Sequence, residues 1–157
     1  MAQIQISGQT LKSSIKRHLS IIGKRLYSKD GKNMFSDITL SSAEEGEILS
    51  QYIKTSAHDI ESVLKQLITQ STVASDITIS IENKRGDADF YPRVTDMIAM
   101  YIVLNSVGEY LSMMHPDIAQ KYHRDAQQRI ESLVAYVFYK KPPTEASADP
   151  LTYDSNS

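Results

Sequence analysis

The sequence predicts a mainly α-helical protein: a four-helix bundle-like domain with a short β-hairpin between helices two and three, and an extended C-terminal tail. Apolar residues recur every three or four positions over four long stretches, which is the spacing of one helix face. Between the second and third stretches the spacing changes to two, as in a half-buried strand. Beyond residue 141 the chain is polar. We therefore expect a helical domain over residues 1–141 and a polar tail over residues 142–157.

Length and composition favour one folded domain. At 157 residues, the chain can bury roughly 68–70% of its unfolded surface around one core. The absence of cysteine excludes disulfides, thiolate metal sites and a cysteine nucleophile, and it fits a reducing cytosol. The longest apolar stretch, 97–104, is far shorter than the ~20 residues of a membrane span, and the first residues lack a secretion signal. We expect a soluble, cytoplasmic protein that does not contact a membrane.

An N-terminal arm over residues 1–9 precedes the first predicted helix. In the arm, Ile4 and Ile6 alternate with glutamines, as in a short strand. The helix follows at about 10–27, with an apolar stripe at Leu11, Ile15, Leu19, Ile22 and Leu26. Basic residues lie largely off this stripe, at Lys12, Lys16, Arg17, Lys24 and Arg25. This basic face is either a solvated helix surface or a surface that docks on an acidic partner.

The second helix is predicted over about 43–71. Ser42-Ala43-Glu44-Glu45 has the Ser-x-x-Glu pattern of a capping box, in which two side chains bind free amides at a helix start. The following stripe of mainly apolar residues keeps a spacing of three or four, at Leu49, Ile53, Ser56, Ile60, Val63 and Leu67. Such a stripe is typical of a bundle seam.

A hairpin is predicted at about 76–91. Its first strand alternates Ile77, Ile79 and Ile81 with polar residues, as a half-buried strand does. Residues 83–87 read as a turn, and residues 88–91 as a short returning strand. Because a single hairpin is marginal in water, it must pack on the helices or pair with a third strand. The N-terminal arm or a hairpin from a neighbouring subunit could supply that strand.

Two more helices complete the predicted bundle. Helix three covers about 93–114, with Pro92 at its start, and it is apolar on much of its surface. The residue before Pro116 disfavours helical geometry, so a break is expected there. Helix four follows with a stripe at Ile118, Tyr122, Ala126, Ile130, Leu133 and Val137. The short connection makes helices three and four antiparallel neighbours.

No motif in the sequence indicates catalysis. The four histidines are scattered without metal-ligand spacing, and no cysteine supports them. Asp87 and Asp89 could bind a cation, but aspartate is common in turns for backbone reasons. Phosphate-binding and nucleophile motifs are also missing. We expect no enzyme activity, no catalytic or metal-ligating residues and no cofactor.

The order of elements resembles the head-to-tail adaptor (connector or neck ring) proteins of tailed bacteriophages. The resemblance is carried by Tyr91 to Pro143, YPRVTDMIAMYIVLNSVGEYLSMMHPDIAQKYHRDAQQRIESLVAYVFYKKPP. In that family a similar helix pair, with a short break before a tyrosine-containing helix, precedes a C-terminal extension. Here the corresponding helix carries Ala119, Tyr122 and Ala126.

The resemblance implies a virion structural protein that forms a closed ring, commonly of about twelve subunits, between portal and tail, with DNA as passing cargo. It implies a location in the virion neck after assembly in the host cytoplasm. The tail would dock on the portal protein or on tail and neck proteins through Lys140, Lys141, Pro142, Pro143, Leu151 and Tyr153. The hairpin would contact neighbouring subunits through Ile77, Ile79, Ile81, Arg85 and Asp87.

A second hypothesis is a cellular helical regulator that binds nucleic acid or an acidic protein through its basic first helix. Clustered Lys and Arg favour phosphate contact. The pI of about 6.1 and the acidic residues of the second helix argue against nucleic acid. The oligomeric state separates the two hypotheses, because only the first requires a large ring.

Overall fold

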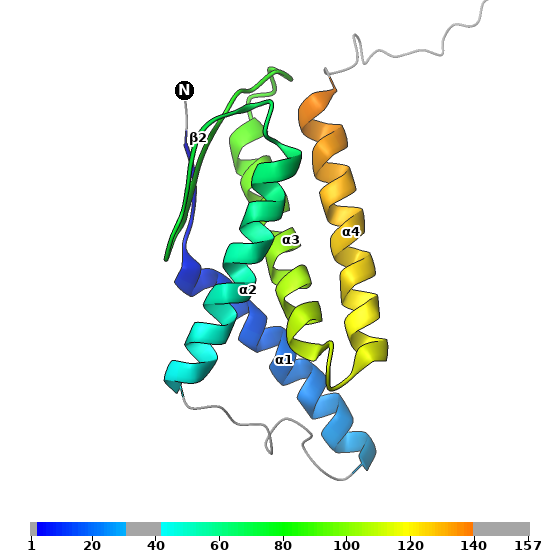
Figure 1. The fold of residues 1–157 in the computed structure, drawn as a ribbon. Coiled ribbons are helices and arrows are strands. Elements are labelled where there is room, and N and C mark those ends of the chain that lie inside the picture. Colours follow the sequence, from blue (N-terminus) through cyan, green and yellow to red (C-terminus); the bar gives the residue numbers. More distant parts are fainter. Residues whose placement is uncertain (1–2, 31–41, 140–157) are drawn as a thin grey trace, which may run out of the picture.

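The structure, a computed structural model, describes residues 3–30 and 42–139; for residues 24–30 and 42–45 it describes the backbone alone. The described elements, in chain order, are β1 (Gln3–Ile6), α1 (Gly8–Asp30), α2 (Ser42–Val63), β2 (Ile68–Val73), β3 (Ile77–Ile81), α3 (Phe90–Leu111) and α4 (Pro116–Phe138). Helices dominate, and a small sheet accompanies them (Figure 1). The predicted mainly α-helical class is confirmed.

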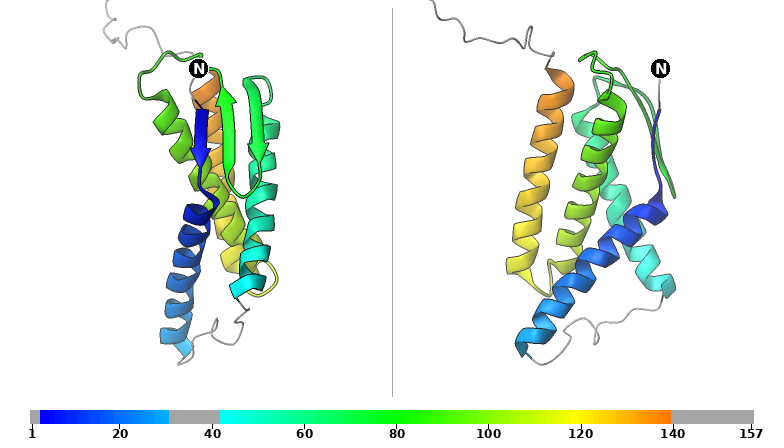
Figure 2. Two further views of the ribbon diagram at one scale, coloured as in Figure 1. Left: turned by 90° about the vertical axis from the view of Figure 1, so that its left-hand side faces the viewer. Right: turned by 180° about the vertical axis from the view of Figure 1, so that it is seen from behind.

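Helix α3 lies at the centre of the bundle. It packs against α1, α2, α4 and the sheet, and this explains why eleven of its residues are buried. A helix that is apolar nearly all round is stable only when neighbours surround it. α4 runs antiparallel beside α3, as predicted, while α1 crosses the bundle diagonally (Figures 1 and 2).

The sheet has the order β1-β3-β2, and both pairings are antiparallel. β3 is therefore the central strand, with Ile4 of β1 and Ser71 of β2 on either side of Ile79. The alternating isoleucines of β3 face the helices and are fully buried. One face of the sheet thus covers the bundle (Figure 2, left). Of the two sources of a third strand that the sequence left open, the N-terminal arm and a hairpin from a neighbouring subunit, the arm supplies it in the structure.

The predicted end of the second helix was wrong. Helix α2 ends at Val63, eight residues before the predicted end at residue 71. A turn follows, in which the amides of Leu67 and Ile68 bond to the carbonyl oxygen of Leu64. Leu64 and Leu67 are buried, so they prolong the helical spacing of apolar residues although the backbone has left the helix. Ile68–Val73 then pairs with β3.

The predicted position of the hairpin was also wrong. The strand that pairs with β3 precedes it in the chain, so the hairpin spans residues 68–81 instead of 76–91. Ala88 lies in a turn, and Phe90 and Tyr91 begin α3. The predicted turn at 83–87 exists, but it connects a strand to a helix. Its one residue with positive φ is Gly86, at 82°.

Helices α3 and α4 meet at the predicted break. α3 ends at Leu111, and Pro116 occupies the first turn of α4.

A series of side-chain hydrogen bonds links α3 and α4 to α2. Asn105 Nδ2 donates to Ser56 Oγ at 2.9 Å, and Asn105 Oδ1 lies 3.3 Å from His123 Nδ1. The His123 ring packs against Gly108, where an added Cβ would come within 2.9 Å of it. A glycine at this position therefore lets the α4 histidine approach α3.

Candidate functional site

A connected polar cluster lies where α4 ends. We call Arg85, Asp87, Tyr136 and Tyr139 the tail root, because Tyr139 directly precedes the segment 140–157. The Tyr136 hydroxyl and Arg85 Nε each donate to Asp87 Oδ2, both at 2.9 Å. Arg85 Nη1 donates to the carbonyl oxygen of Tyr139 at 3.3 Å. The 82–89 loop is thus bound to the last described residue of the chain.

The loop that carries Arg85 and Asp87 is held in shape by Asn83. Its Oδ1 accepts a hydrogen bond from the Gly86 amide at 2.8 Å, and its Nδ2 donates to the carbonyl oxygen of Asp87 at 3.1 Å. Gly86 adopts the left-handed backbone conformation that glycine tolerates best. These contacts fix the direction in which Arg85 and Asp87 point.

Aromatic packing connects the tail root to the core. The Tyr136 ring stacks on Phe90, with centroids 5.9 Å apart and planes inclined by 22°, and Phe90 is fully buried. The Arg85 guanidinium lies 4.3 Å from the centroid of the Tyr136 ring, within cation–π range. The end of α4 is therefore fixed to the start of α3.

The electrostatics of the tail root keep the Tyr136 hydroxyl protonated and the Arg85 guanidinium charged. Burial and the hydrogen bond to Asp87 raise the pKa of Tyr136, so its hydroxyl stays protonated and donates. The hydrogen bond to Asp87 raises the pKa of Arg85. The Arg85 and Asp87 side chains are only 16% and 11% exposed, which limits the screening of this pair by solvent.

Replacing Arg85 with alanine is expected to lower the free energy of unfolding by about 1 kcal/mol, because it leaves the partly buried Asp87 carboxylate with one donor fewer. Arg93→Ala is the matched control. Arg93 also pairs with an aspartate, and its guanidinium lies 5.4 Å from the centroid of the Tyr136 ring. Both side chains of that ion pair are more than half exposed, so its loss should lower stability much less than the loss of Arg85 does. Urea unfolding of both variants measures the difference, and equal losses would contradict a special role for Arg85.

The structure brings together only part of the predicted site. Arg85 and Asp87 meet in the tail root, but they bind the end of their own α4. Ile77, Ile79 and Ile81, predicted to contact neighbouring subunits, are each 0% exposed in the core of the same chain. These side chains lie on the face of the sheet that covers the helices of their own chain, so they present no surface to another subunit.

The remaining predicted residues are spread over the surface or lie outside the described part. On α1, Lys16 and Arg17 are exposed and Lys12 is half-buried. The side chains of Lys24 and Arg25 lie outside the description, as does the predicted docking tail, with Lys140, Lys141, Pro142, Pro143, Leu151 and Tyr153.

Ser71, Glu61 and His58 form the one cluster of described residues that superficially resembles a catalytic triad. Ser71 Oγ donates to Glu61 Oε2, and His58 Nδ1 lies 2.6 Å from Glu61 Oε1. A nucleophilic serine needs the histidine as its direct base, but here the carboxylate lies between the two. Burial raises the pKa of Glu61, but hydrogen bonds from Ser71 and His58 outweigh burial and hold that pKa below its usual value. The order of the three groups does not support nucleophilic catalysis.

Sequence reasoning overlooked Tyr136 and Tyr139 as members of the site. The available signal was the nearly equal length of the two last helices: α3 has 22 residues and α4 has 23. Two antiparallel helices of equal length bring the start of the first beside the end of the second. Residues just before α3 therefore had to meet residues at the end of α4.

Over residues 3–30 and 42–139, the structure has no group of three or more His, Cys, Asp or Glu side chains able to hold a metal ion. Its described helices also include none with the length and apolar character of a membrane span. Comparison of the chain with models of protein families, with curated proteins and with solved structures finds no match.

Proposed function

We propose that the chain is a virion structural protein, a head-to-tail adaptor that forms a ring between portal and tail and leaves a channel for DNA. The proposed partners are the portal protein and the tail or neck proteins, and DNA passes as cargo. In this proposal the ring lies in the virion neck, after assembly in the host cytoplasm. The role is structural, and it requires neither a catalytic group nor a cofactor.

The tail root is the observation that supports this proposal. A segment that docks on a distant partner can hold that partner in a defined position only if the point where the segment leaves the bundle is rigid. Arg85 binds the backbone of Tyr139, and Tyr136 is held by Asp87 and by stacking on buried Phe90. The segment 140–157 therefore starts from a fixed point on the bundle.

The composition of that segment suits docking on a large partner. It begins with Lys140, Lys141 and two prolines, which favour an extended chain. Leu151 and Tyr153 follow as its only large apolar residues, and isolated aromatic and aliphatic anchors often dominate binding energy. If extended, the segment reaches on the order of 60 Å. A partner well beyond the bundle is within that distance.

Deleting residues 142–157 is expected to leave thermal unfolding unchanged and to weaken binding to portal rings at least about a hundredfold. The proposed partner to use is the purified portal protein encoded in the same genome, with binding measured by co-sedimentation. The double variant Leu151→Ser, Tyr153→Ser keeps the full length and removes only the anchors, so it should lose most of the binding too. Undiminished binding by the deletion variant would disprove the docking role of the tail.

Native mass measurement tests the ring independently. A large closed ring, alone or on the portal, supports the adaptor. A monomer or dimer that binds nucleic acid in a salt-sensitive manner would instead support the regulator with a basic first helix, whose Lys16 and Arg17 are exposed.

A further inference from the structure

The strand β2 forms one edge of the sheet. In the order β1-β3-β2 it pairs with β3 on one side, and no other described strand pairs with its outer side. Figure 2 (left) shows this edge next to α2. Natural proteins commonly protect an open edge with charged residues, proline or a bulge. Ile68–Val73 contains neither charge nor proline, and its one irregularity lies between Ile68 and Gln70. Residues 71–73 therefore form a regular, unprotected edge.

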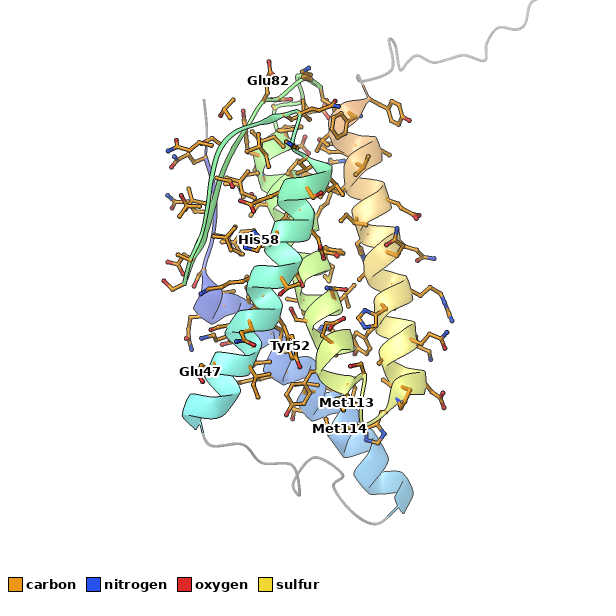
Figure 3. The ribbon with its side chains drawn as sticks, in the orientation of Figure 1. Glu47, Tyr52, His58, Glu82, Met113 and Met114 are labelled. Carbon is orange, nitrogen blue, oxygen red and sulfur yellow. The ribbon has the colours of Figure 1, made fainter. Side chains whose placement is uncertain are left out.

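A groove of about 390 Å³ lies between this edge and α2. Its lining comes from α2 and the turn after it, with His58, Glu61, Ser62 and Lys65, and from β2, with Ile68 and Ser71. Ser71 Oγ donates to Glu61 Oε2, and this bond fixes the strand to the helix. His58 lies on the side of α2 that is next to the sheet (Figure 3). An extended peptide can bind in such a groove by adding a strand to the open edge.

The charges of the groove favour an acidic segment. Its carboxylate, Glu61, already accepts hydrogen bonds on both oxygens, from Ser71 and His58. The Lys65 side chain is exposed and has no ion-pair partner among the residues that the structure describes. Lys65 is therefore the charged group of the lining that remains available to a ligand.

The segment 140–157 starts close to this groove. Tyr139 and Val63, the last residue of α2, line one shared hollow of about 300 Å³. Lys65, two residues after Val63, lines the α2–β2 groove, so the chain leaves the bundle beside the same end of α2. Leu151 lies twelve residues after Tyr139, and twelve extended residues span up to about 40 Å. A helix with its side chains is only about 12 Å across, so this reach is ample.

The three residues Leu151-Thr152-Tyr153 have the apolar–polar–apolar order of a strand in this sheet. The same order occurs in β3 at Ile77-Thr78-Ile79, where both isoleucines are buried against the helices. Side chains alternate between the two faces of a sheet. Beside residues 71–73, the segment would turn its two apolar side chains toward α2 and Thr152 toward the polar outer face.

The charge of the segment complements the groove. Residues 144–157 include Glu145, Asp149 and Asp154 and no Lys or Arg. The two aspartates flank the three strand-like residues. In either strand direction, one of them therefore comes to lie near the start of β2, where Lys65 is available for an ion pair.

Other hollows of the described surface suit this acidic segment less well. A cavity of about 440 Å³ between α1 and α4 includes Asp117 and Asp125 in its lining, against Lys121, so it would repel the flanking aspartates. The hollow beside the tail root contains Arg85 and Arg93, but each arginine already pairs with an aspartate.

We propose that Leu151-Thr152-Tyr153 binds β2 of its own chain as a fourth strand before the tail meets a partner. Because the contact is intramolecular, its effective concentration is in the millimolar range, and even a weak contact is populated. The contact covers both anchor residues of the proposed docking tail. The portal must then displace the segment from β2, and this release step alone rests on the proposed function.

The absence of cysteine from the chain permits a test by disulfide formation in full-length variants. Thr72 and Thr152 are the central residues of the two strands, so they face each other in either strand direction. The variant Thr72→Cys, Thr152→Cys is expected to form a monomeric disulfide under mild oxidation at least about tenfold faster than Gln5→Cys, Thr152→Cys. Gln5 is a matched control, because it lies in the same cross-strand row at the opposite edge of the sheet. Equal rates would overturn the inference, and so would disulfide-linked dimers in place of the monomeric product.

Amide hydrogen exchange tests the contact without new cysteines. Those amides of residues 71–73 that point away from β3 should exchange at least about tenfold more slowly in the wild type than in the double variant Leu151→Ser, Tyr153→Ser. Lys65→Glu should also speed their exchange, because it repels the acidic segment. The amides of Gln3–Ile6 are the internal control and should not change. Equal exchange of residues 71–73 in the wild type and the double variant would contradict the added strand.

These measurements separate the contact from the proposed function. If disulfide and protection are both missing, the contact is overturned even where the tail binds the portal. A fast disulfide in a chain that does not bind the portal supports the contact and contradicts the adaptor. In a chain that does bind, the oxidised Thr72→Cys, Thr152→Cys variant should bind the portal at least about tenfold more weakly than its reduced form. Equal binding by the two forms would overturn the release step.

Discussion

Replacing Ile79 with alanine is expected to lower the free energy of unfolding by about 2–5 kcal/mol. Ile79 is 0% exposed at the middle of the central strand, with β1 and β2 paired on either side of it. Truncation there removes apolar contacts and leaves a cavity beneath the sheet, where the rigid β-strands on both sides limit relaxation. Urea unfolding of the purified chain measures the loss.

Thr78→Ala is the control for this prediction. Thr78 is the neighbouring residue of the same strand and is only half-buried, so its loss should change stability by less than about 1 kcal/mol. Comparing Ile79→Ala with Thr78→Ala also tells whether Ile79 acts in the core of the chain or in a contact between subunits. A subunit contact would leave the monomer as stable as the wild type and weaken only association, and that result would contradict the assignment of Ile79 to the core.

Gly8→Ala is expected to cost about 3 kcal/mol, the upper end of the usual range for overpacking. Gly8 begins α1 directly beside the β2–β3 turn, where its amide donates to Asp76 Oδ1 at 2.9 Å. An added Cβ would overlap the carbonyl oxygen of Ser75. Because that oxygen belongs to the backbone, it cannot rotate away, and the junction of β1 and α1 must move off the hairpin.

Gly46→Ala, in contrast to Gly8→Ala, is expected to raise the stability of the chain. Gly46 lies within α2, and its nearest neighbour for an added Cβ is Lys12 Nζ at 4.0 Å. With space available, alanine in a helix is more stable than glycine by roughly 0.5–1 kcal/mol. Thermal unfolding should therefore move in opposite directions for the two variants. A neutral Gly8→Ala would mean that the first turn of α1 is not packed against the hairpin.

The errors in predicting the elements have a common physical origin. Leu64 and Leu67 have the spacing of a helix face because a buried turn also points its apolar residues inward. The periodicity of apolar residues indicates which side of the chain is buried. A tight turn after a helix can keep its apolar residues on that same side, so the pattern continues although the helix has ended. The partner of β3 was misplaced for the same reason, since β2 had been assigned to the end of the preceding helix.

The candidate site was predictable only in part. The turn residues Arg85 and Asp87 were identified from the sequence as contact residues, but their partners are 49 and 54 positions away, at Tyr136 and Tyr139. Nothing local in the sequence pairs these positions. The pairing follows from the antiparallel packing of two helices of nearly equal length, which is a property of the tertiary fold.

The sequence by itself determined four helices, the break at Pro116 and the apolar face of β3. Periodicity, proline and turn residues act between near neighbours in the chain, so a reader of the sequence can recover them. Only the tertiary structure decided which strand pairs with β3, where Arg85 binds, and that a cavity remains between α1 and α4. These features depend on the angles at which helices cross, and those angles are set by side-chain packing between residues distant in sequence.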